Sequence, residues 1–315
     1  MSEFKAIIKG LISFLPLVNK IKGREGGGAN YARYCYSVWL RHLKLANESG
    51  MNEVPHTLAE LGPGDSLGIG IAALLSGVKS YCAFDVVNFI RLDQNISILY
   101  EIRDLFLNRI DIPGDDEFPL LSPKLIDYSF PTNILQDNLL DISLNESNIN
   151  KIKDSLTSIS IGNYNSKLIS YYAPWTSEKI LQKSSIDFII SQAVLEHVDD
   201  ISKTYEIMYR WLKNGGFSSH QIDFKSHGYA KEWYGHWCYN DFKWLIIKGK
   251  RPYLLNRAPY STHLKLQSFF SFKILKTIKV NANKIANRQN LAYNFKNLTN
   301  EDLSTSSSYI LSQKV

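Results

Sequence analysis

Two acidic side chains lie at the ends of two short apolar segments. Glu60 lies near the end of Thr57–Leu61, and Asp85 comes directly after Ser80–Phe84. Both segments have the length and composition of buried strands, and parallel strands of one sheet end at the same edge. An acid after the second strand can accept two hydrogen bonds from a ribose diol, so Asp85 indicates an adenosine-containing cofactor.

A glycine loop lies between these two acids. The sequence Glu60-Leu-Gly62-Pro-Gly64-Asp65-Ser-Leu-Gly68 predicts a strand, a loop and the start of a helix. Glycine allows a ligand to approach the backbone closely, and the N–H groups of the helix N-terminus face what binds there. Dinucleotide sites have the spacing G-x-G-x-x-G, whereas this loop has G-x-G-x-x-x-G. The carboxylate of Glu60 disfavours a pyrophosphate and suits a cationic amine, which argues against a nicotinamide oxidoreductase.

Histidines farther along the chain are candidates for proton transfer. His197 lies just past a long apolar segment and is the main candidate for a general base. Asp223 and His227, at and beyond the end of a later apolar segment, could converge with His236. These residue types also occur in metal sites, but their spacing is loose. The sequence therefore favours a hydrogen-bonded substrate pocket and predicts no metal.

Four motifs resemble those of class I S-adenosylmethionine-dependent methyltransferases, and the resemblance covers most of residues 30–315. The motifs are Glu60-Leu-Gly-Pro-Gly64, Ala83-Phe-Asp85, Ile186-Asp-Phe-Ile-Ile-Ser-Gln-Ala-Val-Leu-Glu-His-Val198 and Leu212-Lys-Asn-Gly-Gly216. The order strand, L-E-H-V, helix, L-K-x-G-G and strand is quite specific for this family. The chain departs from the family at Ser66, where a third glycine is common.

The resemblance implies S-adenosylmethionine as the methyl donor and S-adenosylhomocysteine as the product, with no metal expected. By position, the glycine loop would contact the methionine moiety, the acid after the second strand the ribose, and the segment after the third strand the adenine. The residues that would bind the cofactor are Arg33 and Tyr36 on the preceding helix, Glu60, Gly62, Gly64, Asp85, Trp175, and Ser191 and Gln192 beneath the sulfonium. Arg33 and Tyr36 have an alternative interpretation, as a surface arginine and part of an aromatic core face.

Strands and helices alternate from residue 57 onward, which predicts a parallel sheet covered on both faces. The segments predicted as strands are Thr57–Leu61, Ser80–Phe84, Lys167–Tyr172, Ile186–Ser191 and Phe217–Phe224, with Phe270–Val280 and Tyr309–Gln313 alternating like an antiparallel pair. Together with the resemblance, this pattern predicts an α/β fold. We expect a doubly wound, Rossmann-like, seven-stranded sheet that is mostly parallel and has an antiparallel C-terminal strand pair.

The expected organisation has two parts. Residues 1–50 hold an N-terminal amphipathic segment and a helix that caps the cofactor, and residues 51–315 form the methyltransferase domain. Insertions interrupt the domain at about 110–165 and about 225–260. The second insertion is dense in aromatic residues and histidine, so we expect it to build the substrate site, whereas we expect the acidic first insertion to seal the domain edge.

The charge of the chain is unevenly distributed around a formal net charge of +6. Residues 51–200 carry 10 basic and 21 acidic side chains, whereas residues 201–300 carry 17 basic and 4 acidic ones. The acidic block contains the predicted donor site and suits a cationic sulfonium. The basic block follows the fourth strand, where the family places the acceptor, so we expect an anionic or anion-tethered acceptor.

Cysteine spacing and hydropathy bear on location. The three cysteines form no C-x-x-C pair, so the sequence predicts neither a disulfide framework nor a zinc ribbon. It contains no run of about 18 apolar residues, so it predicts no membrane-spanning helix. Residues 4–22 mix apolar side chains with lysines, and we expect this segment to pack on the domain as a helix. A second interpretation is contact with an anionic membrane face. The expected location is cytoplasmic, with peripheral contact at the inner membrane face as the alternative.

These features predict an enzyme that O-methylates a saccharide or another polar small molecule by in-line displacement, with a histidine as base. A nucleic-acid partner is not favoured, because Ser191-Gln-Ala-Val stands where nucleic-acid amino methyltransferases carry Asn/Asp-Pro-Pro-aromatic. The sequence leaves open an N-methyltransferase, a nucleic-acid methyltransferase and a non-catalytic cofactor-binding scaffold.

Overall fold

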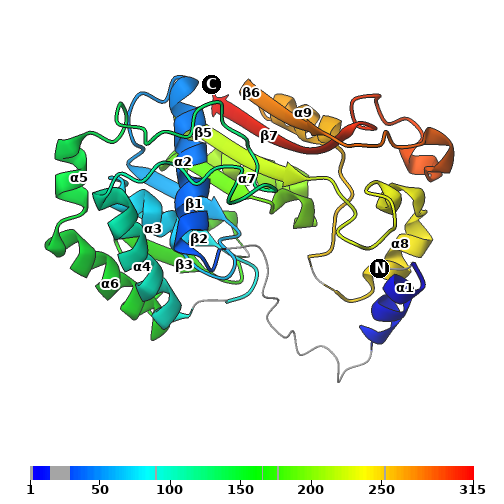
Figure 1. The fold of residues 1–315 in the computed structure, drawn as a ribbon. Helices are drawn as coiled ribbons and strands as arrows, with labels where there is room; N and C mark the ends of the chain where they lie inside the picture. Colours follow the sequence, from blue (N-terminus) through cyan, green and yellow to red (C-terminus); the bar gives the residue numbers. More distant parts are fainter. Residues whose placement is uncertain (1–2, 15–28, 89–90, 165, 176, 252) are drawn as a thin grey trace.

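A seven-stranded sheet in the order β3-β2-β1-β4-β5-β7-β6 forms the centre of the protein (Figure 1). The computed structural model describes residues 3–14, 29–88, 91–164, 166–175, 177–251 and 253–315. The strands are β1 Thr57–Leu61, β2 Ser80–Phe84, β3 Ile169–Tyr172, β4 Ile186–Gln192, β5 Leu212–Asp223, β6 Phe272–Asn281 and β7 Thr305–Lys314. The first five are parallel, and β7 runs antiparallel to both β5 and β6. The predicted fold class is therefore confirmed.

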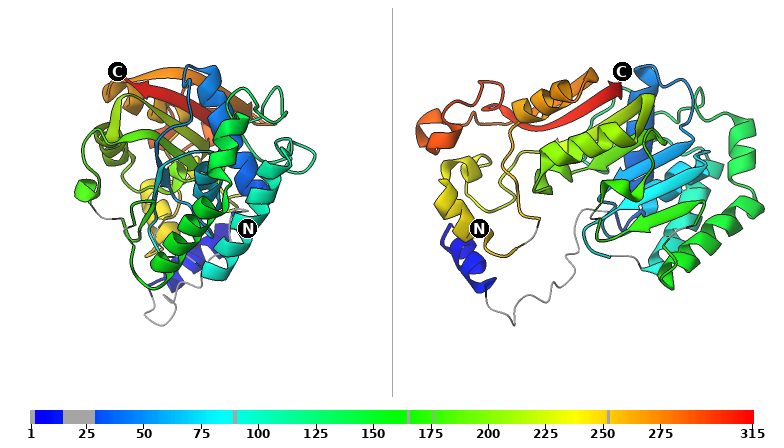
Figure 2. Two further views of the ribbon diagram at one scale, coloured as in Figure 1. Left: turned by 90° about the vertical axis from the view of Figure 1, so that its left-hand side faces the viewer. Right: turned by 180° about the vertical axis from the view of Figure 1, so that it is seen from behind.

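Helices cover both faces of the sheet. The α-helices are α1 Glu3–Ile12, α2 Ala32–Glu48, α3 Gly68–Leu75, α4 Leu92–Leu107, α5 Asp137–Ser143, α6 Glu146–Ser160, α7 Ile201–Trp211, α8 Asp241–Lys248 and α9 Tyr260–Phe269. Short 3₁₀ helices are η1 Glu178–Ile180, η2 Leu195–His197, η3 Gly235–Cys238, η4 Arg288–Asn290 and η5 Tyr293–Phe295. The two views in Figure 2 show the helices on either side of the sheet.

Neighbouring residues of each central strand belong to different hydrophobic clusters. In β1, Leu58 packs in the cluster with α2, α3, α4 and α6, whereas Ala59 packs in the cluster with α7 and α9. In β4, Phe188 and Ile190 face the first cluster and Ile189 faces the second. Successive side chains of a strand point to opposite faces, so a strand covered on both faces is apolar throughout. This requirement explains the unbroken apolar runs in the sequence.

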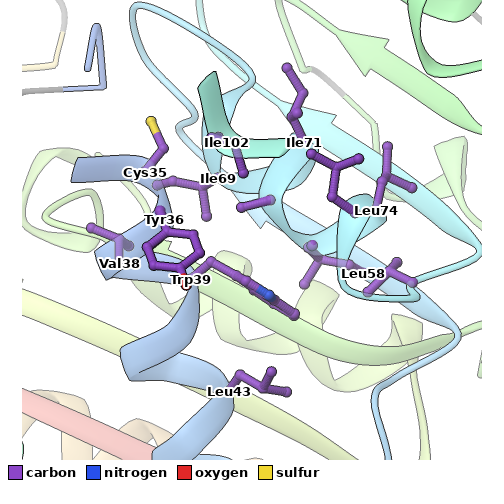
Figure 3. Packing of buried hydrophobic residues seen from close by; sticks show 14 of the residues in the cluster. Cys35, Tyr36, Val38, Trp39, Leu43, Leu58, Ile69, Ile71, Leu74 and Ile102 are labelled. Atoms are coloured by element: carbon purple, nitrogen blue, oxygen red, sulfur yellow. The ribbon is translucent and has the colours of Figure 1, made fainter. Parts of the chain in front are cut away.

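The first cluster fixes α2 against α3 and β1. Tyr36 and Trp39 of α2 are fully buried and lie beside Ile69 of α3 and Leu58 of β1 (Figure 3). The indole N–H of Trp39 donates to the Ser76 hydroxyl over 2.8 Å at the C-terminal end of α3. The helix before β1 is thus part of the main core, and its first turn is held at the edge where the parallel strands end.

The acidic first insertion is attached to α2 by a buried arginine. Arg41 is 0% exposed, and its guanidinium donates to the carbonyl oxygens of Pro113 and Pro123 over 3.0 and 2.7 Å. It also donates to the Ser37 hydroxyl over 3.0 Å and lies over the ring of Tyr128. A buried cation is tolerated only when its donors are paired, so Arg41 and these carbonyls hold the loop in one conformation.

The N-terminal helix packs on the second insertion. Helix α1 crosses α8 closely, and glycine at position 10 allows this approach. A Cβ there would lie 1.9 Å from the carbonyl oxygen of Ile246. The Ser13 hydroxyl accepts from the backbone N–H of Lys250 over 2.8 Å, and Ala6 is fully buried. Both figures show α1 beside α8 (Figures 1 and 2). The described part of the segment 4–22 is therefore a packed helix, while residues 15–22 lie outside the described residues. The domain boundary near residue 50 stays a prediction.

Replacing Arg41 by lysine is expected to lower the free energy of unfolding by about 3 kcal/mol, because an ammonium cannot reproduce the fork of donors and leaves buried carbonyls unpaired. Urea denaturation measures this loss, and limited proteolysis should show earlier cleavage within residues 111–130. Arg109→Lys is the matched control, since Arg109 forms an exposed ion pair with Asp137. Equal stability of the two variants would contradict the role given to Arg41.

Candidate functional site

The loop after β1 brings two glycines to the edge where the parallel strands end. Gly62 and Gly64 have φ values of +66° and +73°, a region that favours glycine. A Cβ at Gly62 would lie 2.5 Å from Cγ2 of Val194, whereas a Cβ at Gly64 would meet nothing within 4 Å. Gly62 is therefore required by the packing of the β4 exit against the β1 tip, and Gly64 leaves the backbone open to a ligand.

Asp85 closes the same loop from the end of β2. Its side chain accepts from the backbone N–H groups of Gly64 over 3.2 Å and Val86 over 2.7 Å. Burial raises the pKa of the Asp85 carboxyl to about 6, and the nearby Asp65 also raises it. The carboxylate is thus held in place by backbone donors before any ligand arrives, at the position where the sequence predicts a ribose-binding acid.

A cavity of about 480 Å³ opens between β1, β2 and α7; we call it the Asp85 cavity. Trp175, which follows β3, forms one wall, and its backbone N–H donates to the carbonyl oxygen of Asp85 over 2.8 Å. The other walls include Gly62, Val194 and His197. Of the residues predicted to bind the cofactor, Gly62, Asp85 and Trp175 line this cavity.

Three other predicted cofactor residues are bonded inside the protein. Glu60 is buried and accepts from the Tyr81 hydroxyl over 2.5 Å, and burial raises the pKa of its carboxyl to about 8. The Ser191 hydroxyl is 2.7 Å from Nδ1 of His220. The Gln192 amide donates to the carbonyl oxygen of Ser122 over 2.9 Å. These side chains support the strand ends, and they are not among the residues that line the Asp85 cavity.

The two residues predicted on α2 lie farther away. Arg33 forms an ion pair with Glu117 of the first insertion, with 2.6 Å between Nη2 and Oε2. Tyr36 is fully buried, and its hydroxyl donates to the carbonyl oxygen of Ile110 over 2.6 Å. Both side chains connect α2 to the first insertion, and neither lines the Asp85 cavity.

A larger cavity of about 860 Å³ lies on the other side of the β4 exit; we call it the Trp233 cavity. It is bounded by the start of α2, the first insertion, and the ends of β5 and β6. Its aromatic and aliphatic walls are Tyr31, Tyr34, Phe118, Leu120, Leu121 and Trp233, and its charged side chains are Glu117, Asp223, Lys124, Lys225 and Lys284. Both insertions thus contribute to one cavity.

The β4 exit separates the two cavities. Ala193 lines the Trp233 cavity, and the next residue, Val194, lines the Asp85 cavity. Ala193 has a φ of +55°, and its backbone N–H donates to the carbonyl oxygen of Gln221 in β5 over 3.0 Å. This left-handed residue turns the chain out of β4 into η2, so that two successive residues, 193 and 194, line different cavities.

Three of the four predicted catalytic residues gather near this exit. The ring centroids of His197 and His227 are 5.1 Å apart, and Nε2 of His227 lies 3.6 Å from Oδ2 of Asp223. Nδ1 of His197 is 2.9 Å from the carbonyl oxygen of Tyr253. His227 also lines a third, open cavity of about 720 Å³, together with Asp223 and Trp233.

His236 differs from these three. It is 2% exposed in η3, and its Nδ1 has no hydrogen-bond partner within the described ranges of the chain. Burial lowers the pKa of its imidazole to about 3. Of the aromatic residues around it, Trp237 is fully buried, whereas Trp233 reaches the Trp233 cavity. The periodicity of this insertion gave no signal for which ring faces the core.

Glu196 belongs to the cluster although the sequence pattern singled it out only as part of a motif. The residue is 3% exposed; Oε1 accepts from the backbone N–H of Asp223 over 3.3 Å, and Oε2 has no hydrogen-bond partner among the described residues. Burial raises the pKa of this carboxyl to about 8. In the sequence, the only indication of a role for Glu196 was its position directly before His197. The turn of η2 brings the side chains of both residues close to His227.

Residues 143–219 match a family model described as a methyltransferase domain. The matched segment contains β3, β4, η2, α7 and the start of β5, which carry the β4 exit described above. This match and the sheet, in which an antiparallel β7 lies between β5 and β6, support the resemblance to class I S-adenosylmethionine-dependent methyltransferases. The findings support the predicted family and a methyltransferase activity.

Several solved structures are similar to this chain at low identity. A SAM-dependent methyltransferase from Methanosarcina mazei has 13% identity and a TM-score of 0.42, with 86% of this chain and 97% of that chain covered. Phosphoethanolamine N-methyltransferase 2 from Haemonchus contortus, in complex with S-adenosyl-L-methionine, has 12% identity and a TM-score of 0.42, with 90% and 56% covered. Geranyl diphosphate C-methyltransferase from Streptomyces coelicolor, in complex with Mg²⁺, geranyl diphosphate and S-adenosyl-L-homocysteine, has 10% identity and a TM-score of 0.44, with 94% and 87% covered. No curated protein matches the sequence. None of these values bears on the acceptor of this chain.

Binding of S-adenosylhomocysteine is expected to weaken as the pH falls through about 6. The ionised Asp85 carboxylate accepts the ribose hydroxyls more strongly than the protonated acid, and burial places the pKa of this group near 6. Calorimetry should give a dissociation constant that is flat above pH 7 and about fivefold higher at pH 5. In Asp85→Asn, the affinity should be lower at every pH and the pH dependence absent. A wild-type affinity that is constant from pH 5 to 7.5 would contradict this role.

Proposed function

We propose that this protein transfers the methyl group of S-adenosylmethionine to a hydroxyl group of a polar, anionic small molecule such as a saccharide. The observation that carries the proposal is the pair of cavities that are lined by the adjacent residues Ala193 and Val194. A donor in the Asp85 cavity and an acceptor in the Trp233 cavity would approach each other from opposite sides of the β4 exit. That arrangement suits an in-line displacement, for which the enzyme mainly aligns the two reactants.

The donor is proposed to bind along the strand ends. Asp85 would accept from the ribose hydroxyls, Trp175 would contact the adenine, and the open backbone at Gly64 would allow the methionine moiety to approach. A carboxylate that backbone N–H groups already hold in place needs little rearrangement on binding, which favours affinity.

The lining of the Trp233 cavity supports the acceptor class. Trp233, Tyr31 and Tyr34 offer ring faces on which a sugar ring can pack, and Trp233 is fixed because its indole N–H donates to the carbonyl oxygen of Lys284 over 2.6 Å. Three lysines against two carboxylates favour an anionic group on the acceptor. These walls do not form the flat, basic groove that would follow a nucleic-acid backbone.

Deprotonation of the hydroxyl is proposed to occur at the cluster of His197, Asp223 and His227. A hydroxyl needs help to lose its proton near neutral pH, and an imidazole is the side chain suited to that task. His197 lines the Asp85 cavity, the proposed donor site, and Nε2 of His227 lies 3.6 Å from Oδ2 of Asp223, which lines the Trp233 cavity. An amine acceptor, the second candidate, would need less help with its proton.

Filling the Trp233 cavity is expected to block the acceptor and spare the donor. Ala282→Trp places an indole in that cavity, so the KM for the acceptor should rise about tenfold while the affinity for S-adenosylhomocysteine stays unchanged. Acceptors are found by incubating candidates with labelled S-adenosylmethionine, and mass analysis of the product identifies an O-, N- or C-methyl group. Ile126→Trp, at a fully exposed position, is the control. A loss of donor affinity in Ala282→Trp, or an unchanged KM, would contradict the assignment of the two cavities.

We also propose that α1 and α8 contact an anionic membrane surface. None of the helices in the described part of the chain combines the length and apolarity that crossing a bilayer requires. The two adjacent helices nevertheless expose large apolar side chains, namely Phe4 (72%), Leu11 (53%), Phe242 (73%) and Leu245 (62%). Lysines occur in both helices among these residues, which suits the interface of an anionic bilayer.

Vesicle flotation tests this surface in the full-length protein. Wild type is expected to float with vesicles that contain phosphatidylserine and less with neutral vesicles. The double variant Phe4→Ser with Leu11→Ser should bind about tenfold more weakly, because it removes apolar area from the contact. Leu107→Ser with Ile126→Ser removes exposed apolar side chains elsewhere and is the matched control. Equal flotation of the two double variants would refute the proposal.

A further inference from the structure

We propose that Glu196, His197 and His227 form a binding site for a divalent transition-metal cation between the Asp85 cavity, which His197 lines, and the third, open cavity, which His227 lines. Each of the three residues offers one ligand atom, and these atoms all lie within 4.8 Å of one another. Two imidazoles and one carboxylate are a donor set that Zn²⁺ and Mn²⁺ accept, whereas Mg²⁺ and Ca²⁺ prefer oxygen ligands alone. The loose spacing of these residues in the sequence gave no sign that their ligand atoms converge.

A buried carboxylate oxygen without a partner points to a missing ligand. Glu196 is 3% exposed, and its Oε1 accepts from the backbone N–H of Asp223, but in the part of the chain that the structure describes Oε2 has no hydrogen-bond partner. Buried polar atoms are normally paired, because an unpaired one costs free energy that folding does not recover elsewhere. A cation beside Oε2 would supply the missing interaction.

The polar contacts of the two histidines indicate which nitrogen can bind a cation. A carbonyl oxygen only accepts, so the contact of His197 with the carbonyl oxygen of Tyr253 requires the proton on Nδ1 and leaves the lone pair on Nε2. Asp223 lies 3.6 Å from Nε2 of His227, which favours the proton there and the lone pair on Nδ1. A metal-binding histidine typically donates its other N–H to a carbonyl or carboxylate in this way.

The backbone around the cluster is held from a separate loop. The side-chain amide of Asn256 donates to the carbonyl oxygens of Leu195 over 2.7 Å and Val198 over 2.8 Å. The backbone N–H of Asn256 donates to the carbonyl oxygen of Glu196 over 2.8 Å. Three hydrogen bonds from one residue therefore fix η2, which carries two of the three ligands. His227 has a φ of +46°, and the turn at Ser226 sets this backbone. Sites that bind metal require this kind of support for their ligands.

The catalytic consequence rests on the proposed function. Three protein ligands leave a coordination position for the acceptor hydroxyl, and a cation lowers the pKa of a bound hydroxyl. The hydroxyl proton would pass to solvent water. The oxygen lone pair would then form the bond to the methyl carbon, and the electrons of the carbon–sulfur bond would stay on sulfur. The two histidines would act as ligands, and the cation would replace a histidine base.

Cobalt binding tests the site without any assay of turnover. Metal-free protein titrated with Co²⁺ should develop visible absorption that saturates at about one cation per chain, and Zn²⁺ should abolish it while excess Mg²⁺ should not. Glu196→Gln keeps the shape of the side chain but removes its charge, and His227→Ala removes a ligand. Each should weaken Co²⁺ binding at least about tenfold. His56→Ala, at an exposed histidine outside the cluster, should bind like wild type.

Calorimetry with S-adenosylhomocysteine on the same samples separates this proposal from the proposed function. Unchanged affinity for S-adenosylhomocysteine in Glu196→Gln and His227→Ala shows that these variants fold and retain the donor site, so their loss of Co²⁺ would support the metal site. Wild type that binds S-adenosylhomocysteine but not Co²⁺, or variants that bind Co²⁺ like wild type, would overturn the metal site and leave the proposed function standing. Full methyl transfer by metal-free protein would overturn the catalytic consequence.

Discussion

The contact between Gly62 and Val194 is the constraint on which the arrangement of the site depends. No side chain fits at Gly62, because a Cβ there would lie 2.5 Å from Val194. The tip of β1 and the exit of β4 therefore pack directly on each other, and the chain turns through the left-handed Ala193 into η2. This tight contact lies where the Asp85 cavity and the Trp233 cavity are separated, directly before the turn that carries Glu196 and His197.

The two insertions and the N-terminal helix are organised around this partition. Arg41 attaches the first insertion to α2, so that Phe118 and Leu121 form walls of the Trp233 cavity. The second insertion supplies Trp233 to the same cavity, and α8 supports α1. The insertions differ in composition but have a common place at the carboxyl edge of the sheet, where the ends of parallel strands leave room for a ligand. The acidic insertion therefore does more than the sealing expected from its sequence.

Local sequence signals predicted the bounds of the strands well, but they predicted the positions and contacts of polar side chains less well. The predicted bounds of β1 and β2 agree with the structure, because short apolar runs between turns leave little choice of register. The position of Asp85 at the edge of the sheet was also predictable, since this residue directly follows a strand of the parallel sheet. In contrast, the ion pair of Arg33 with Glu117 and the burial of His236 depend on insertions whose path no periodicity defines. Glu196 lies near His227 because η2 and the Ser226 turn bring together residues that are 31 positions apart in the sequence.

The central claim is that donor and acceptor bind on opposite sides of Ala193 and Val194. A crystal structure of the complex with S-adenosylhomocysteine tests this claim most directly. We predict that the ribose hydroxyls donate to Asp85, the adenine lies against Trp175, and the sulfur faces the β4 exit with the Trp233 cavity open beyond it. S-adenosylhomocysteine bound in the Trp233 cavity, or bound without contact to Asp85, would contradict the account.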